Sequence, residues 1–141
     1  MQLVTAQTIV AEALRFARMR NLKPLSVVVL DARGAWKAMA AEDGTSLHRT
    51  EVAHGKAYGG IALGMSSRKI MERAENQPYF VAAMSHVTGG RVVPVAGGVL
   101  IRDGAGALLG AVGISGDTSD NDEAACCAGV AAAGLVAETG A

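Results

Sequence analysis

Apolar side chains recur at helical spacing near the start of the chain, between residues 5 and 20. They stand three and four residues apart, and polar side chains fall on the opposite face, which is typical of an amphipathic helix. Thr5 is a candidate N-cap for this helix, and Asn21 is a candidate end. The pattern therefore predicts a first helix over about 5–20.

The pattern then changes to short, uninterrupted apolar runs. LSVVVLD after Pro24 and AWKAMAA after a turn at residues 32–34 predict one β-hairpin. VVPVAGGVLIR, which begins at Val92, and ALLGAVGIS are joined by a turn of Asp and Gly at residues 103–106. These two runs predict a second hairpin.

Helical patterns separate the two hairpins. One helix is predicted over about 47–61, with Thr45 or Ser46 as its cap. This helix contains three glycines, which weaken a helix, so we expect another part of the chain to pack very close to it. One or two shorter helices are predicted over 66–84, with a break at Pro78.

The last predicted helix is rich in small residues and begins at Ser119, which together with Asp122 resembles a capping box. The order of elements is helix, two strands, two or three helices, two or three strands, helix. Strand pairs separated by blocks of helix predict an antiparallel sheet with helices packed on it, in an α+β fold. We expect one domain over residues 1–141, half of which are hydrophobic.

Composition and charge narrow the function classes. The chain has 13 basic and 13 acidic residues without a basic cluster, which argues against nucleic acid as a partner. We find neither a leader pattern nor a run long enough to cross a bilayer, and we expect a cytoplasmic protein without membrane contact. Aromatic residues make up only 4% and small residues abound, which favours homo-oligomers, as dimers or larger assemblies.

Glycines concentrate in the second predicted hairpin, at Gly97, Gly98, Gly113 and Gly116. Glycine weakens a strand unless a ligand or another backbone must come close, so these positions indicate a site. The acidic stretch that follows lacks the glycine of a calcium loop, and no phosphate-loop motif is present. We predict no metal site, and we interpret the neighbouring Cys126 and Cys127 as buried thiols.

Few other residues are candidates for chemistry. Lys56 is either an exposed lysine or a cation or base held in a pocket with Glu123. The three histidines, His48, His54 and His86, are not spaced as a metal pair on one helix turn, and each is more often structural than functional.

The stretch PVAGGVLIRDGAGALLGAVGISGDTSDNDEA resembles the signature of the haem-binding GlcG/HbpS family. Upstream, an Asp and Gly pattern in the first hairpin and the Lys-Ala pair at Lys56 also resemble the family, so the likeness covers nearly the whole chain. The positions that match the signature are Pro94, Gly97, Gly98, Ile101, Gly106, Gly110, Gly113, Ser115, Gly116, Asp122 and Glu123.

The resemblance implies a profilin-like or roadblock-like antiparallel sheet flanked by helices, and binding of haem or another tetrapyrrole. A similar domain ends the PduO-type corrinoid adenosyltransferases. Relatives that bind haem can use a histidine of the first helix, but residues 5–20 contain none. The axial ligand would then be His48, His54, His86 or a methionine.

Two functions follow as hypotheses. The first is a protein that binds a small organic ligand or tetrapyrrole between subunits, over the glycine-rich hairpin. Lys56 and Glu123 are among its expected polar contacts, and Ser115, His48 and His86 are further candidate contacts. The alternative is an isomerase or lyase acting on a small acidic metabolite, with Lys56 or His54 as base and backbone N–H groups of the hairpin holding an oxyanion. A third interpretation is that the small-residue helices serve assembly alone.

Overall fold

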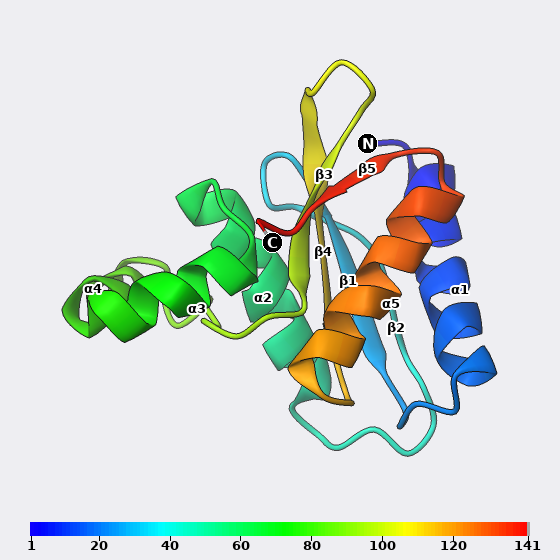
Figure 1. Ribbon diagram of the computed structural model, residues 1–141, viewed down its shortest axis with the longest axis horizontal. Coiled ribbons are helices and arrows are strands. Elements are labelled where there is room, and N and C mark those ends of the chain that lie inside the picture. The colour runs from blue at the N-terminus through cyan, green and yellow to red at the C-terminus, as the bar shows by residue number, and fades with distance from the viewer. Residues whose placement is uncertain (141) are drawn as a thin grey trace.

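A five-stranded antiparallel sheet with helices on both faces forms the centre of the molecule (Figure 1). The computed structural model describes residues 1–140, and its strands lie in the order β2-β1-β4-β3-β5. The predicted α+β fold is confirmed. The elements are α1 (Leu3–Met19), β1 (Ser26–Asp31), β2 (Trp36–Ala41), α2 (Arg49–Leu63), α3 (Ser67–Asn76), α4 (Pro78–Val87), β3 (Gly98–Arg102), β4 (Leu108–Ser115), α5 (Ser119–Ala132) and β5 (Val136–Glu138).

The two faces of the sheet carry separate hydrophobic clusters because neighbouring side chains of a strand point to opposite sides. In β1, Val27 and Val29 pack in the cluster that includes α1 and α5. Val28 and Leu30 pack in the cluster that includes α2. Every side chain of β1 except Asp31 is buried, which explains why its sequence reads as an unbroken apolar run.

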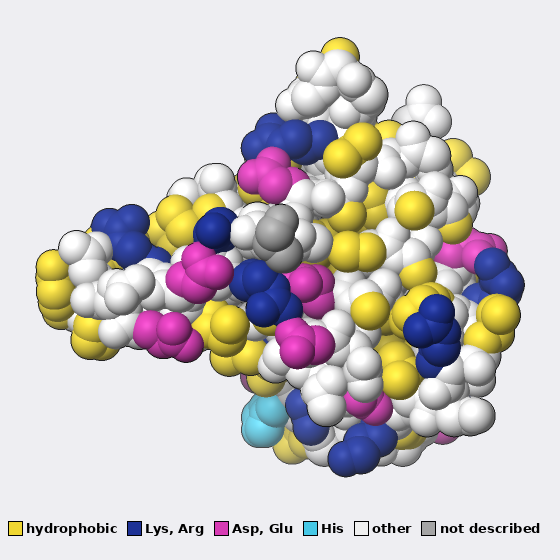
Figure 2. All heavy atoms as spheres, in the orientation of Figure 1, with side chains coloured by type: hydrophobic (Ala, Val, Ile, Leu, Met, Phe, Trp, Pro, Cys, Tyr) yellow, Lys and Arg dark blue, Asp and Glu magenta, His cyan; other side chains and the backbone are white. Residues whose placement is uncertain are grey.

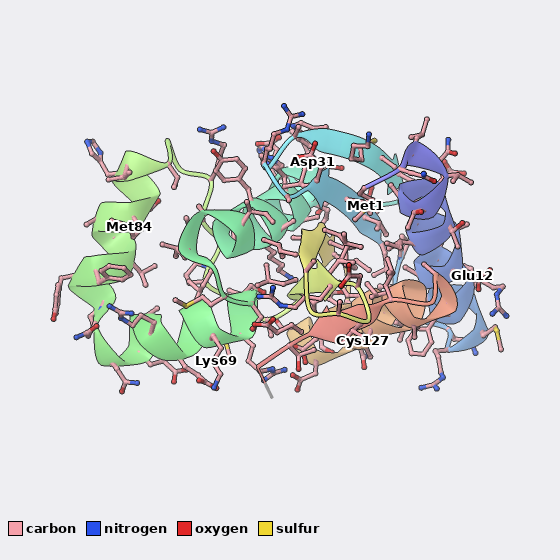
Figure 3. All side chains as sticks on the ribbon, turned by 90° about the horizontal axis from the view of Figure 1, so that it is seen from above. Met1, Glu12, Asp31, Lys69, Met84 and Cys127 are labelled. Atoms are coloured by element: carbon pink, nitrogen blue, oxygen red, sulfur yellow. The ribbon has the colours of Figure 1, made fainter. Side chains whose placement is uncertain are left out.

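Helices α3 and α4 form an arm that projects away from the sheet (Figures 1 and 3). The predicted break at Pro78 is confirmed, since α4 begins there and Pro suits the first position of a helix. A small cluster of Ile70, Val81 and Val92 holds the arm together. In the view from above, Met84 on α4 lies on the opposite side of the molecule from Glu12 on α1.

The helix ends differ in part from the prediction. Asn21 lies just past the end of α1 with a φ of 53°, as expected for a residue that ends a helix. The prediction of Thr5 as the N-cap was wrong, because α1 begins at Leu3 and Gln2 occupies the cap position.

The predicted caps of two later helices were also wrong. Helix α2 begins at Arg49 after His48, so neither Thr45 nor Ser46 caps it. Helix α5 is capped one residue earlier than expected, by Thr118, whose Oγ1 accepts a hydrogen bond from the backbone N–H three residues on.

The predicted strand from Val92 begins only at Gly98. A Cβ at Gly59 would lie 3.3 Å from Val92, and one at Gly55 would lie 2.5 Å from Val93, whose N–H donates to the Gly55 carbonyl at 3.2 Å. These apolar residues therefore pack onto α2 instead of joining the sheet. Gly97 has a φ of 117°, which breaks extended geometry just before the strand. The three-residue strand β5 at the sheet edge was not predicted.

Candidate functional site

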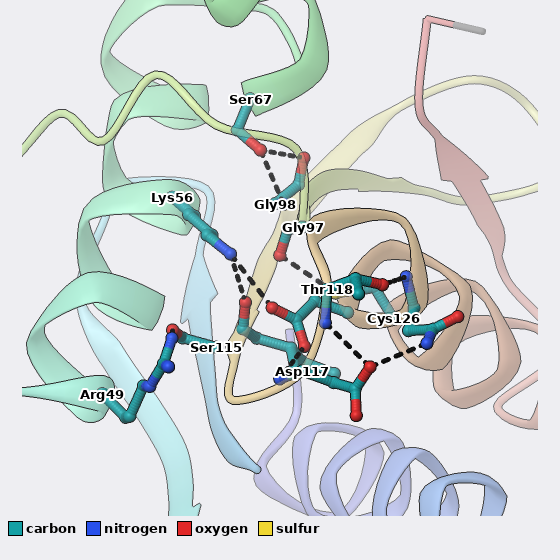
Figure 4. Close-up of polar contacts among 12 residues, drawn as sticks. Arg49, Lys56, Ser67, Gly97, Gly98, Ser115, Asp117, Thr118 and Cys126 are labelled. Atoms are coloured by element: carbon teal, nitrogen blue, oxygen red, sulfur yellow. Dashed lines mark hydrogen bonds and ion pairs between the residues drawn. The ribbon is translucent and has the colours of Figure 1, made fainter. Parts of the chain in front are cut away.

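Lys56 on α2 forms a buried ion pair with Asp122 on α5, across the sheet. The Nζ of Lys56 donates to Asp122 Oδ2 at 3.3 Å and to the backbone carbonyl of Ile114 at 2.9 Å. The two side chains are only 3% and 2% exposed. The side chain passes beside Gly97, where a Cβ would lie 2.8 Å from Nζ, so glycine leaves the space that the ammonium group needs (Figure 4).

The Asp122 carboxylate organises the corner between β4 and α5. Its Oδ1 accepts a hydrogen bond from the backbone N–H of Asp117 at 3.0 Å. Burial raises the pKa of Asp122, while this hydrogen bond and Lys56 act in the opposite direction. We infer that the carboxylate is ionised, because an ammonium group lies in direct contact with it and both are enclosed.

Glu123 does not contact Lys56, contrary to the expected pocket. Successive residues of a helix point about 100° apart, and Glu123 turns toward α3 instead. There the Nε of Arg68 donates to both of its carboxylate oxygens, at 3.2 and 3.0 Å. Arg68 also contacts Asp120, and these hydrogen bonds raise the pKa of its guanidinium. The three side chains fasten the base of the arm to α5.

The glycines of the second hairpin are covered by the protein's own backbone. A Cβ at Gly113 would collide with the carbonyl of Ala53 on α2, and one at Gly98 would lie 2.5 Å from the carbonyl oxygen of Lys56. A Cβ at Gly116 would meet the carbonyl of Pro24. The close approach inferred from these glycines is confirmed, and it is made by the backbone of α2 and of the segment before β1.

The backbone of the hairpin is also occupied. The N–H of Gly98 donates to Ser67 Oγ at 2.7 Å, and the carbonyl of Gly97 accepts from Ile114 N–H at 2.8 Å. In this conformation the Gly98 N–H is therefore not free to hold an oxyanion. Ser115 Oγ accepts from Arg49 Nη1 at 3.2 Å (Figure 4).

The two cysteines are free thiols, as expected, although only Cys126 is fully buried. Its Sγ lies 3.3 Å from the carbonyl oxygen of Gly97, and burial raises its pKa. Cys127 is half-buried, and its pKa is also raised by burial. Neither thiol is activated for chemistry. Among residues 1–140, no three His, Cys, Asp or Glu side chains are grouped so as to hold a metal ion.

The structure does not bring His48 and His86 together with the hairpin glycines. His48 is exposed at the start of α2, where its Nδ1 lies 3.1 Å from Glu51. His86 is exposed in the last turn of α4, on the arm. Their assignment as ligand contacts stays a prediction.

His54 lies in a cluster of rings on the outer side of α2. Its imidazole stacks on the indole of Trp36, with ring centroids 4.4 Å apart and an interplanar angle of 9°. Tyr58, one helix turn on, lies 5.4 Å away, and the guanidinium of Arg91 lies 4.3 Å from the centre of the Tyr58 ring. Burial lowers the pKa of His54, and the nearby charge of Arg91 lowers it further. We call these four residues the aromatic surface.

A family model described as haem degrading protein HbpS-like matches residues 1–131. The chain belongs to this HbpS-like family. A search of the curated proteins finds no match. None of the helices within residues 1–140 combines the length and apolar character needed to span a membrane.

Solved structures share the fold of this HbpS-like protein over nearly its whole length. The haem complex of PduOC has a TM-score of 0.86 at 22% identity, covering 98% of each chain. The ORFY protein of Klebsiella pneumoniae has a TM-score of 0.84 at 20% identity, covering 95% of this chain and 90% of its own. HbpS itself has a TM-score of 0.80 at 23% identity, covering 93% and 88%.

Trp36, Tyr58 and Arg91 were missed as candidate residues of this HbpS-like chain. Trp36 is the single tryptophan and was placed correctly in a strand, but its contact with His54 joins the start of β2 to α2, which are distant in the sequence. The structure shows that Trp36 is 52% exposed, and a large apolar side chain left on the surface indicates an interaction site.

Proposed function

We propose that this HbpS-like protein binds haem, or a closely related tetrapyrrole, with His54 as the axial ligand of the iron. The family description and the likeness to the haem complex of PduOC support haem as the ligand. The observation that carries the choice of residue is the stacking of His54 on Trp36, because it fixes the orientation of one histidine among three.

The state of His54 suits this role. Iron binds the neutral imidazole, and a lowered pKa keeps His54 neutral to a lower pH than an ordinary histidine. No hydrogen bond within residues 1–140 occupies either ring nitrogen of His54, so a nitrogen is available to a metal. Trp36 and Tyr58 offer apolar ring surface to a planar ligand, and Arg91 offers a cation to a carboxylate on its edge.

The alternative, an isomerase or lyase that uses Lys56 as base, gains no support from the geometry. A base must reach its substrate, whereas Lys56 is 3% exposed and hydrogen-bonded to two groups of the protein. His54 is accessible and has the cation of Arg91 nearby, but no carboxylate contacts its ring within residues 1–140, so no second acid or base stands beside it.

The test is a haem titration followed through the Soret band, on the wild type and on His54→Ala. We expect saturation at one haem per chain for the wild type and at least a tenfold loss of affinity for the variant, because the iron loses its ligand. His48→Ala and His86→Ala are matched controls and should bind as the wild type does. Loss of the band in one of these controls instead, or no saturable band at all, would refute the proposal.

We also propose that the chain self-associates through the arm, with a second copy of this chain as the partner. Tyr79 and Val87 on α4 are 72% and 73% exposed, and α4 carries no Asp, Glu, Lys or Arg. Figure 2 shows hydrophobic side chains at the tip of the arm. The double variant Tyr79→Ser, Val87→Ser should lower the mass of the assembly found by light scattering, whereas an unchanged mass would exclude the arm as the interface.

The free thiols fit the cytoplasmic location that we propose.

A further inference from the structure

A cavity of about 200 Å³ lies where three loops meet at one end of the sheet. Its walls come from the segment before β1, the segment between β2 and α2, and the end of β4, with Arg49 contributed by the first turn of α2. Two of the lining side chains, Lys23 and Arg49, are cationic, and none of the lining residues is acidic.

The two cations differ from nearly all others in the molecule because, within residues 1–140, neither forms an ion pair or lies over an aromatic ring. Of the 13 Lys and Arg side chains, seven form ion pairs and three lie over aromatic rings. Lys23, Lys37 and Arg49 are the remainder within residues 1–140. Two of these three line the same cavity, where the charge of Lys23 is offset only in part by nearby Asp117 and both cations remain available to a ligand.

The carboxylate of Asp117, which follows the lining residue Gly116 in the chain, is already engaged. Asp117 accepts hydrogen bonds from the backbone N–H of Lys23 at 2.8 Å, from Thr118 N–H at 2.8 Å and from Asn121 Nδ2 at 2.7 Å. These hydrogen bonds lower the pKa of Asp117 to about 2, and the bond from Asn121 has the largest effect. Asp117 therefore fixes the backbone of Lys23 in the cavity wall. Its charge also acts on the Lys23 ammonium, but the two groups lie too far apart to form an ion pair.

The remaining polar groups are suited to an oxyanion. Arg49 uses one guanidinium nitrogen on Ser115 Oγ, which positions the group and leaves its other donors free. Thr45 and Ser46 line the same cavity, and within the part of the chain that the structure describes their hydroxyls have no hydrogen-bond partner. The Ser115–Arg49 bond comes from the end of β4, so the sheet itself holds the cation in place.

A neighbouring hollow shows the contrast. It is larger, about 430 Å³, and shares Pro24 as a wall, but Glu42 and Asp43 line it. Its cation, Arg18, is paired with Glu42 at 2.9 Å. An anion there would meet carboxylates, whereas the polar side chains that line the smaller cavity are two cations and two hydroxyls.

We propose that the cavity around Lys23 and Arg49 is a binding site for a small oxyanion, a carboxylate or a phosphate group. The charge of Lys23 attracts the anion, Arg49 matches its planar or tetrahedral oxygens, and the hydroxyls of Thr45 and Ser46 complete the contacts. A volume of 200 Å³ admits such a group together with a few waters, which each occupy about 30 Å³ in the liquid. This site is separate from His54 and does not depend on haem binding.

The experiment is a titration of the ¹⁵N-labelled full chain with sodium phosphate and, separately, with sodium acetate, followed by amide chemical shifts. Sodium chloride keeps the ionic strength constant, which removes general screening as a cause of the shifts. We expect saturable shifts at Lys23, Thr45, Ser46, Arg49 and Gly116. The anion that saturates at the lower concentration identifies whether phosphate or carboxylate chemistry fits the site.

Lys23→Gln and Arg49→Gln should each weaken the binding about tenfold, the loss expected for one charged hydrogen bond. Lys37→Gln is the matched control, since Lys37 is also an unpaired cation but does not line the cavity, and it should leave the affinity unchanged. Amide spectra of each variant without added anion establish that the fold is intact. The proposal is overturned if neither anion gives saturable shifts, or if Lys37→Gln weakens binding as much as the cavity variants do.

Discussion

The Lys56–Asp122 pair and the aromatic surface both begin on α2, but they lie on opposite sides of that helix and have opposite chemistry. Lys56 faces the sheet, is enclosed, and finds two acceptors. His54, two residues earlier, faces outward, where rings hold it and no hydrogen bond occupies its nitrogens within residues 1–140. A buried polar group must be satisfied by the protein, so unused bonding capacity is found at the accessible surface.

This difference shows that a charged residue in a glycine-rich region is not by itself a site. The glycines around Lys56 make room for the close packing of α2 and for the ammonium group. Around His54, the rings of Trp36 and Tyr58 fill the space, and the nitrogens of the imidazole stay accessible. Four substitutions test the contrast.

Lys56→Met should cause the largest change, a loss of about 3–5 kcal/mol in the free energy of unfolding, because it leaves the Asp122 charge buried without a partner. Urea denaturation measures it. Lys69→Met is the matched control: its pair with Glu72 is exposed, so the loss should stay below about 1 kcal/mol. Equal effects for the two variants would contradict the assignment of Lys56 as an enclosed structural cation.

Gly113→Ala should cost about 1–3 kcal/mol, because its new methyl group meets the Ala53 carbonyl and forces α2 away from the sheet. Gly104→Ala is the control, since no heavy atom lies within 4 Å of a Cβ there, and its effect should stay within about 0.5 kcal/mol. Thermal or urea unfolding gives both values. A neutral Gly113→Ala would mean that α2 lies less tightly on the hairpin than described.

Trp36→Ala should raise the pKa of His54 toward its ordinary value, because burial is the main cause of the lowered pKa. Proton NMR titration of the imidazole measures this, with exposed His86 as an internal control. In the wild type, the unfolded chain binds a proton at His54 more readily than the folded chain does, because folding lowers the pKa of His54. The free energy of unfolding therefore falls as the pH drops below about 6.5. In Trp36→Ala this fall should become smaller, and haem release on acidification should shift to higher pH.

Arg91→Gln should raise the pKa of His54 by less than Trp36→Ala does, because the charge of Arg91 is the second cause and burial is the first. The same titration applies. Arg20→Gln removes a cation that also lies over a ring, that of Phe16 on α1, and should leave His54 unchanged. If Arg91→Gln has the larger effect, charge and not burial controls this imidazole.

The sequence correctly predicted those elements that depend only on residues close to one another in the chain. The amphipathic first helix, the β1–β2 hairpin and the break at Pro78 all follow from neighbouring residues. The segment from Val92 misled because residues that pack on glycines of a helix have the same apolar pattern as a buried strand. The resemblance in the second hairpin identified the family correctly.

The candidate site was less predictable because its contacts join distant residues. Lys56 was expected either to be exposed or to lie in a pocket with Glu123, but its partner is Asp122. This difference of one helix position turns the side chain to another face. The stack of Trp36 on His54 joins a strand and a helix, and no spacing rule predicts it. The hydroxyls of Thr45 and Ser46 were assigned to a helix cap and instead line a cavity.

The path of the Lys56 side chain past the ends of β3 and β4 links two helices that lie on opposite faces of the sheet. If either α2 or α5 left the sheet, one charge of this pair would be exposed to solvent or left buried without its partner. Amide hydrogens of the two helices should therefore exchange with solvent in a single cooperative opening, at rates that converge as denaturant is added. The arm formed by α3 and α4 lies outside this link, and its amides should exchange first.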